Sequence, residues 1–440
     1  MKQRLFIGSL AALALMASCS SSNDDLNGGA TTPQESNVPL TFSSYLGRTA
    51  TTRAGATGTI TTDGTGNTTS LQTEGFGLFA YYTDNSSYGT SSTPNFMYNT
   101  KVTGTPTDAP TSWTYSPLRY WPNETGTDGT NGATSEGVDH LTFFAYAPYV
   151  EATATTGAVT DNTVGITALT SNTTAGDPKV SYTVAADPAK SVDLLWGVSN
   201  TATWDNVTGK ALTLTEGLPY LNLIKPKTGQ NVSFNFKHAL SRLGLTVQGA
   251  FDQKAPGGTL KDAKITVAKV EITGENFAAK GVLNLNNTEA GVPKWETVDG
   301  ASTLSLTLDG DNLNDKIKDA GDGKKAAEQP DGVTATSQSL LKDNTYFMFI
   351  PGTATADKPL KVKITYYTTT DDPNLSGGYT RVENVITKSI SATDGLKFEA
   401  GKAYTLNLVL GMTSVKVTAT VAGWTDDSST TQVDLPINVE

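Results

Sequence analysis

Short segments in which apolar and polar residues alternate recur throughout this 440-residue chain. A period of two places the apolar side chains on one face of a β-strand, whereas an amphipathic helix needs a period near 3.6. Thr, Gly, Asn and Ser are abundant between the segments, and Val, Ile, Tyr and Phe are concentrated within them. This composition is typical of strands joined by turns. The sequence therefore predicts an all-β protein without long helices.

The predicted strands follow one another at short spacing with turn residues between them, which indicates β-sandwiches. A turn over residues 253–258, which contains Gly, Lys and Pro, separates two series of strands, and we place a domain boundary near residue 252. We expect an N-terminal β-sandwich domain over residues 54–252 and a C-terminal one over residues 253–440. The predicted strand segments are residues 75–82, 141–149, 193–197, 234–243, 263–272, 281–285, 303–308, 345–351, 360–367, 403–410 and 415–421.

The N-terminus has the features of an export signal. A short basic segment precedes an apolar run over residues 5–17, which is shorter than the roughly 20 residues that a membrane-spanning helix needs. Small residues at the end of the run are followed by Cys19, the only cysteine in the chain. This arrangement resembles a bacterial lipobox and predicts removal of residues 1–18 as a signal peptide, with acylation of Cys19. The alternative is a spare cysteine in an ordinary secretory signal. A single cysteine cannot form a disulfide framework, so burial and backbone pairing must hold the fold together.

The charge of the chain bears on its partners. The formal net charge is −11 and charged residues make up 17% of the sequence. Acidic residues are spread along the chain, and the sequence contains no basic stripe. Because nucleic-acid binding needs clustered Lys and Arg to neutralise phosphates, the sequence argues against a nucleic-acid partner.

The two histidines are weak candidates for catalysis or metal binding. His140 and His238 lie far apart in the sequence and have no cysteine partners, so a zinc site lacks ligands. Neither lies near a G-x-S-x-G sequence, although a Ser-His-Asp triad is defined by geometry and stays open as an alternative. We expect His238 to be a hydrogen-bonded structural residue, and we expect no catalytic residue and no cofactor.

An acidic loop over residues 309–315 has some likeness to a calcium-binding loop, since Ca²⁺ prefers clustered oxygen ligands. Leu313 occupies a position where an EF-hand needs Asp or Asn, and the bidentate Glu is missing. We therefore expect a solvated connecting loop and no metal site.

A group of aromatic residues offers two interpretations. They could stack against a sugar, but aromatic residues in strands more often fill a sandwich core, and we favour the core. The residues are Trp113, Tyr115, Tyr120, Trp121, Tyr146 and Tyr149.

Two segments at opposite ends of the chain share the same alternation. Near the N-terminus the apolar residues are Val38, Leu40 and Phe42, and at the C-terminus they are Val433, Leu435, Ile437 and Val439. Both segments could occupy the same groove. Pro436 interrupts the second segment and cannot donate a ladder hydrogen bond, so one side of that strand is expected to be incompletely paired.

The order of several motifs resembles the fimbrillin family, and the resemblance covers nearly the whole chain. The motifs are the lipobox at Cys19, the Thr-Arg-Ala-Gly sequence over residues 52–55, the stretch from Trp121 through residues 143–149, the His-Ala-Leu-Ser-Arg-Leu sequence over residues 238–243, and Trp424 with the terminal strand. The resemblance implies two tandem transthyretin-like β-sandwich domains and assembly with other pilin subunits into a type V pilus that serves adhesion. It also implies an outer-membrane lipoprotein precursor, held by lipid through Cys19 and matured by an arginine-specific protease into a cell-surface fimbria.

The resemblance gives the two alternating segments distinct roles. Cleavage after Arg53, with Arg48 as the alternative site, would remove a lipidated propeptide over residues 19–53. The strand that this propeptide carries would be a blocking strand. Residues 431–440 of another subunit would be a donor strand that fills the vacated groove by strand addition.

Two other functions stay open. The chain could be a non-polymerising surface or pilus-tip adhesin that binds a glycan or a host or bacterial surface protein. It could also be an enzyme. This alternative is the weakest, because His140 and His238 are weak candidates for catalytic residues.

Overall fold

The computed structural model describes residues 38–46, 59–62, 68–104, 113–122, 139–205, 211–226, 230–250, 263–296, 303–342, 345–392, 395–411, 414–423, 433–434 and 438–439. The regular structure within these ranges consists of β-strands, one short helix, α1 (Leu71–Glu74), and three 3-10 turns at Pro188–Lys190, Gly310–Asn312 and Ala326–Glu328. The prediction of an all-β protein is confirmed. None of the helices in these ranges has the length and apolar character needed to cross a membrane.

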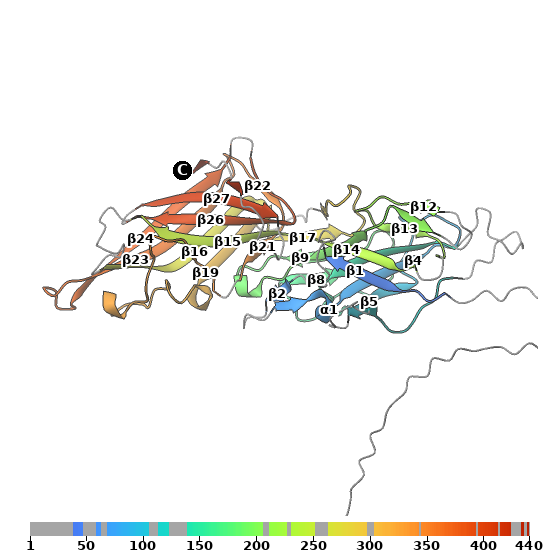
Figure 1. Cartoon of the computed structure of the whole chain (residues 1–440), viewed down its shortest axis with the longest axis horizontal. Coiled ribbons are helices and arrows are strands. Elements are labelled where there is room, and N and C mark those ends of the chain that lie inside the picture. The colour runs from blue at the N-terminus through green and yellow to red at the C-terminus, as the bar shows by residue number, and fades with distance from the viewer. Residues whose placement is uncertain are drawn as a thin grey trace, which may run out of the picture. The chain divides into compact units, whose positions relative to one another are not determined.

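The first sheet has eight strands in the order β1-β14-β10-β7-β4-β5-β6, and β13 also pairs with β7. Strands β1 and β14 lie side by side although they are far apart in the sequence (Figure 1). The strands are β1 (Phe42–Leu46), β4 (Phe76–Tyr82), β5 (Met97–Gly104), β6 (Trp113–Thr114), β7 (Leu141–Ala147), β10 (Leu195–Ser199), β13 (Tyr220–Leu223) and β14 (Val232–His238).

Strand β7 explains how this sheet separates two apolar clusters. Every residue of β7 is buried. Phe143 and Ala145 point into a smaller cluster, which we call the N-terminal core, whereas Phe144 and Tyr146 point into the larger one. A strand buried on both faces reads as a continuous apolar run, which is how residues 141–147 appear in the sequence.

A four-stranded sheet, β18-β17-β9-β8, combines strands from both sides of residue 252, because β17 pairs with β9. Strands from both predicted domains thus share one sheet, and the sheet does not mark a boundary at residue 252. The division into domains at this residue and the tandem arrangement of two sandwiches stay predictions. The strands are β8 (Gly165–Leu169), β9 (Lys179–Thr183), β17 (Lys280–Asn284) and β18 (Lys294–Glu296). Two hairpins are formed by β2 (Thr59–Thr62) with β3 (Thr68–Ser70) and by β11 (Thr203–Asp205) with β12 (Ala211–Thr213).

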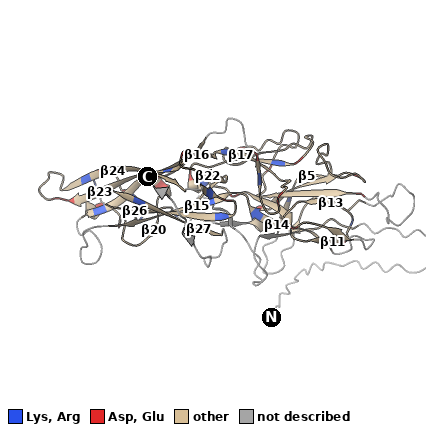
Figure 2. Ribbon diagram, turned by 90° about the horizontal axis from the view of Figure 1, so that it is seen from above, with Lys and Arg blue, Asp and Glu red and all other residues tan. Residues whose placement is uncertain are grey.

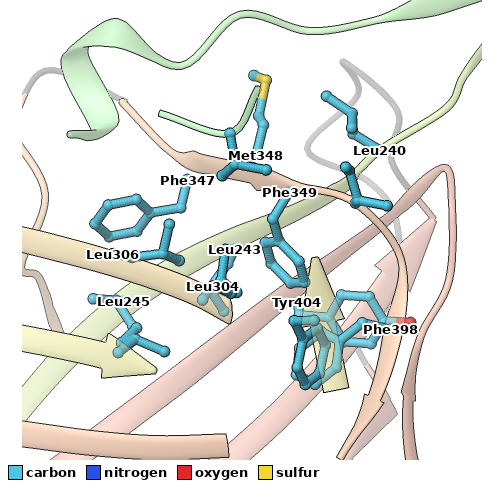
Figure 3. Close-up of a cluster of buried hydrophobic side chains, with 14 of the residues drawn as sticks. Leu240, Leu243, Leu245, Leu304, Leu306, Phe347, Met348, Phe349, Phe398 and Tyr404 are labelled. Carbon is cyan, nitrogen blue, oxygen red and sulfur yellow. The ribbon is translucent and has the colours of Figure 1, made fainter. Parts of the chain in front are cut away.

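Two further sheets face each other in the C-terminal part of the chain. The six-stranded sheet has the order β20-β15-β26-β27-β28, with β21 paired to β15, and the five-stranded sheet has the order β19-β16-β23-β24-β29. Leu243, Leu304 and Tyr404 lie among the side chains between them (Figure 3).

The strands of these sheets have the following bounds. The six-stranded sheet contains β15 (Ser241–Gly249), β20 (Gln338–Ser339), β21 (Phe347–Phe349), β26 (Lys402–Leu410), β27 (Val415–Gly423) and β28 (Val433–Asp434). The five-stranded sheet contains β16 (Ala263–Ala278), β19 (Thr303–Asp309), β23 (Leu360–Asp371), β24 (Tyr379–Ser391) and β29 (Asn438–Val439). A hairpin joins β22 (Gly352–Ala354) and β25 (Leu396–Phe398).

Lys and Arg residues are scattered over many strands rather than gathered along one (Figure 2). This distribution agrees with the scattered charges of the sequence.

Candidate functional site: the slot that holds the N-terminal strand

The N-terminal strand, residues 38–46, lies in a slot between two other parts of the chain. On one side it pairs in parallel with β14, with Phe42 opposite Val232. On the other side it contacts residues 115–121, which we call the wall segment. The alternating segment predicted at Val38, Leu40 and Phe42 is found as an isolated bridge at Pro39 followed by β1.

Three hydrogen bonds join the N-terminal strand to the wall segment. The Leu40 amide donates to the Arg119 carbonyl at 2.9 Å. The Trp121 amide donates to the Val38 carbonyl at 3.0 Å. The Tyr115 hydroxyl donates to the Leu40 carbonyl at 2.7 Å. Burial raises the pKa of Tyr115, so its hydroxyl stays protonated at neutral pH and remains a donor.

The opposite side of the N-terminal strand is bonded to β14 and the residue before it. The Val232 amide donates to the Thr41 carbonyl at 3.0 Å, and the Thr41 hydroxyl donates to the side-chain oxygen of Asn231. The backbone groups therefore alternate along the strand. Thr41 faces β14, whereas Val38 and Leu40 face the wall segment.

The even-numbered side chains of the N-terminal strand complete the N-terminal core. Leu40 is 0% exposed and Phe42 is 5% exposed, and Val38 packs at the edge of the same cluster. The Phe42 ring lies 5.2 Å from the Tyr115 ring and 5.9 Å from the Phe143 ring, measured between centroids. Burying Leu40 and Phe42 contributes roughly 3–6 kcal/mol, at about 1.5–3 kcal/mol for each side chain. The strand is therefore an integral part of the core in this chain.

The terminal segment, residues 433–439, is described only at its two ends. Strand β28 pairs with β27, and strand β29 pairs with β24, so the ends contact strands of two different sheets. Leu435 and Ile437, two of the four predicted donor residues, lie outside the described residues.

The predicted modification sites also lie outside the described residues. They are Cys19 for lipidation, with Arg48 and Arg53 for proteolysis. Lipidation and cleavage at these residues stay predictions. Trp424 of the family motif is likewise outside the described residues.

The histidines do not come together. Nδ1 of His238 lies 2.5 Å from the carboxylate of the buried Asp193, which confirms that His238 is a hydrogen-bonded residue. Nδ1 of His140 lies 3.1 Å from the carbonyl oxygen of Ser86. Over the part of the chain that the structure describes, no group of three or more His, Cys, Asp or Glu residues is placed to hold a metal ion.

The acidic loop pairs with lysines. Asp311 forms an ion pair with Lys318 at 2.7 Å, and Asp315 forms one with Lys342 at 2.9 Å. The hydrogen bond from Lys318 lowers the pKa of Asp311. These two carboxylates therefore have cationic partners within the protein.

The aromatic residues mostly serve as core, as predicted. Trp121 and Tyr146 are buried in different clusters, so they cannot form one sugar-stacking surface. Tyr120 is 45% exposed. Tyr115 has a role that sequence reasoning missed, because it bonds the N-terminal strand, and the density of Tyr and Trp over residues 113–121 was the available signal.

Comparisons with known proteins agree on one family. Residues 52–424 match the family described as fimbrillin-like. The fimbrium subunit Fim1C of Phocaeicola vulgatus is 29% identical over 404 residues, which span 87% of this chain and 89% of that protein. The crystal structure of a fimbrial protein from Bacteroides vulgatus has a TM-score of 0.56 at 23% identity, covering 88% of this chain and 100% of that chain. The resemblance predicted from the sequence is confirmed, and the chain belongs to the fimbrillin-like family.

Proposed function

We propose that this chain is a non-enzymatic structural subunit of a cell-surface fimbria that serves adhesion. In this proposal the N-terminal strand fills the slot of the precursor, proteolysis removes it, and the terminal segment of a second subunit takes its place. The observation that supports the proposal most is that residues 38–46, upstream of both candidate cleavage arginines, fill part of the N-terminal core. Because this strand fills part of the core, its removal would leave a slot that a strand from another chain can fill.

Removal of this strand would expose a surface that another strand could cover. Strand β14 would lose β1, keep β10 on its other side, and become an open sheet edge, which readily pairs with a strand from another chain. The wall segment would lose its bonds to Val38 and Leu40. Phe143 and Phe234, which contact the Phe42 ring, would lose part of their apolar cover. An extended segment with alternating apolar side chains would satisfy all three losses.

The covalent link explains why cleavage is required. While residues 38–46 belong to the same chain as the slot, their effective concentration is high, and a segment from another subunit competes poorly. Cleavage after Arg53, or after Arg48, makes the resident strand a separate peptide and removes that advantage. The mature chain would then begin at Ala54 or at Thr49.

The same proposal accounts for the precursor at the membrane. Acylation of Cys19, for example by palmitate, would hold the precursor at the outer membrane until cleavage separates the lipidated peptide from the subunit. Palmitate labelling of the Cys19→Ala protein tests this step, and the label should be lost.

The decisive experiment is deletion of residues 431–440 in the native host. We expect an exported, processed monomer with a near-normal melting temperature that forms no fimbriae. The full-length protein, followed by electron microscopy and N-terminal sequencing of sheared fimbriae, is the control. If the truncated protein assembles normally, the terminal segment is not the donor. A large fall in melting temperature would mean that the segment instead completes its own subunit.

A further inference from the structure

We infer that the terminal segment of a second copy enters the slot in one register, with Pro436 in the place of Pro39. This inference rests on the proposed function and specifies the partner of the same slot. It starts from a residue-by-residue match between the two ends of the chain. Residues 37–43 read Asn-Val-Pro-Leu-Thr-Phe-Ser, and residues 434–440 read Asp-Leu-Pro-Ile-Asn-Val-Glu.

With the prolines aligned, each position keeps its chemical character. Leu435, Ile437 and Val439 take the places of the three inward-facing residues, Val38, Leu40 and Phe42. Asn438 and Glu440 take the places of the outward-facing polar residues Thr41 and Ser43. In the sequence, Asp434 aligns with Asn37.

The hydrogen bonds of the slot explain why a proline fits there. Leu40 gives its amide to the wall segment, so the nitrogen of the preceding residue, Pro39, points to the β14 side. On that side the first described bond is the one from Val232 to the Thr41 carbonyl, two residues further on. A proline at position 39 therefore removes no described hydrogen bond. A proline at position 40 would remove the bond to Arg119.

A register shifted by two residues also keeps the alternation but fits less well. It would place Val433 at position 38 and Pro436 at position 41. Thr41 donates a hydrogen bond to the side chain of Asn231, which proline cannot do. In the proline-matched register Asn438 stands at position 41, and its amide group can form that bond. Pro436, which was expected to leave an inserted strand incompletely paired, is thus the residue that sets the register of that strand.

Disulfide cross-linking can distinguish the two registers, with a single cysteine in the terminal segment and a cysteine at one of two positions in the slot. Position 41 neighbours Asn231, and position 43 is opposite Ser233 in the parallel pairing with β14. Neighbouring residues of paired strands lie within the distance range that a disulfide spans. The only native cysteine, Cys19, precedes both candidate cleavage sites.

The experiment combines Asn438→Cys with either Asn231→Cys or Ser233→Cys in the full-length precursor, expressed in the native host. Fimbriae are sheared, oxidised and analysed on denaturing gels and by mass spectrometry. We expect disulfide-linked ladders with Asn231→Cys and loss of those ladders with Ser233→Cys. Each single-cysteine protein is the control.

The outcomes separate this inference from the proposed function. Cross-linking through Ser233→Cys would overturn the proline-matched register while leaving strand exchange intact. Fimbriae that form without either cross-link would overturn the inference that the terminal segment occupies this slot. If the unmodified protein forms no polymer after processing, the proposed function fails first, and the inference fails with it.

Discussion

The two ends of this chain carry similar alternating segments but are held in different ways. The N-terminal strand pairs with β14 over the five residues of β1 and forms three further bonds to the wall segment. Two of its side chains, Leu40 and Phe42, are buried. In the described part of the terminal segment, two residues pair in β28 and two in β29, and these strands belong to different sheets.

In the proposed exchange, proteolysis removes the N-terminal strand and the terminal segment binds a second subunit. Extensive pairing and burial make the N-terminal strand costly to displace while its chain is intact. The described pairing of the terminal segment joins Val433 and Asp434 to β27 and Asn438 and Val439 to β24. The following experiments test whether the two ends compete for one slot.

The largest effect is expected from Ile437→Asp. In the proline-matched register Ile437 takes the place of Leu40, which is fully buried. An unpaired carboxylate there costs more than an unpaired amide or hydroxyl, for which burial costs about 2–7 kcal/mol, so fimbriae should be lost. The melting temperature of the monomer should be nearly unchanged, as measured by calorimetry. Asp434→Asn, on the outward face, is the matched control. Normal fimbriae from the Ile437→Asp protein would contradict the comparison.

Phe42→Ala tests the other end of the chain. Removing this ring leaves a cavity in the N-terminal core and should destabilise the uncleaved precursor by about 3–5 kcal/mol. After cleavage the residue is gone, so the mature subunit should have an unaltered melting temperature. Comparing thermal unfolding before and after proteolysis provides the measurement, with Ser43→Ala as control. Equal losses in both forms would mean that the N-terminal strand stays bound after cleavage.

Val439→Phe tests which register the terminal segment adopts in the slot. If Val439 enters the place that Phe42 occupies, phenylalanine should fill it better and strengthen the subunit junction by about 1–2 kcal/mol, because more apolar area is buried. Fimbriae should then dissociate at a higher temperature or denaturant concentration. Ile437→Phe is the matched comparison, and a gain in that protein instead would favour the shifted register.

Tyr115→Phe should have the smallest effect. The ring that packs on Phe42 remains, but the hydrogen bond to the Leu40 carbonyl is lost. A loss of about 0.5–1.5 kcal/mol is expected for the precursor. The same loss should appear in the fimbria, because the bond is to a backbone carbonyl that any inserted strand supplies. An effect confined to the precursor would show that Tyr115 recognises only the resident strand.

Much of the fold could be predicted from periodicity. The strands over residues 263–272, 360–367, 403–410 and 415–421 correspond to β16, β23, β26 and β27. Alternation identifies such strands because one face is buried and the other is solvated. The pairing of β17 with β9 could not be predicted, since β-sheets join strands that are distant in sequence and alternation does not specify the partner.

For the candidate site, the sequence by itself identified the segments that take part. They are two alternating segments with matched prolines, and the arginines between the first segment and the folded domains. Only the tertiary structure decided that the N-terminal strand lies between β14 and the wall segment, with Tyr115 bonded to its backbone. The reason is that the side-chain pattern of a strand is local, whereas the hydrogen-bond partners of its backbone come from whichever segments the fold brings beside it.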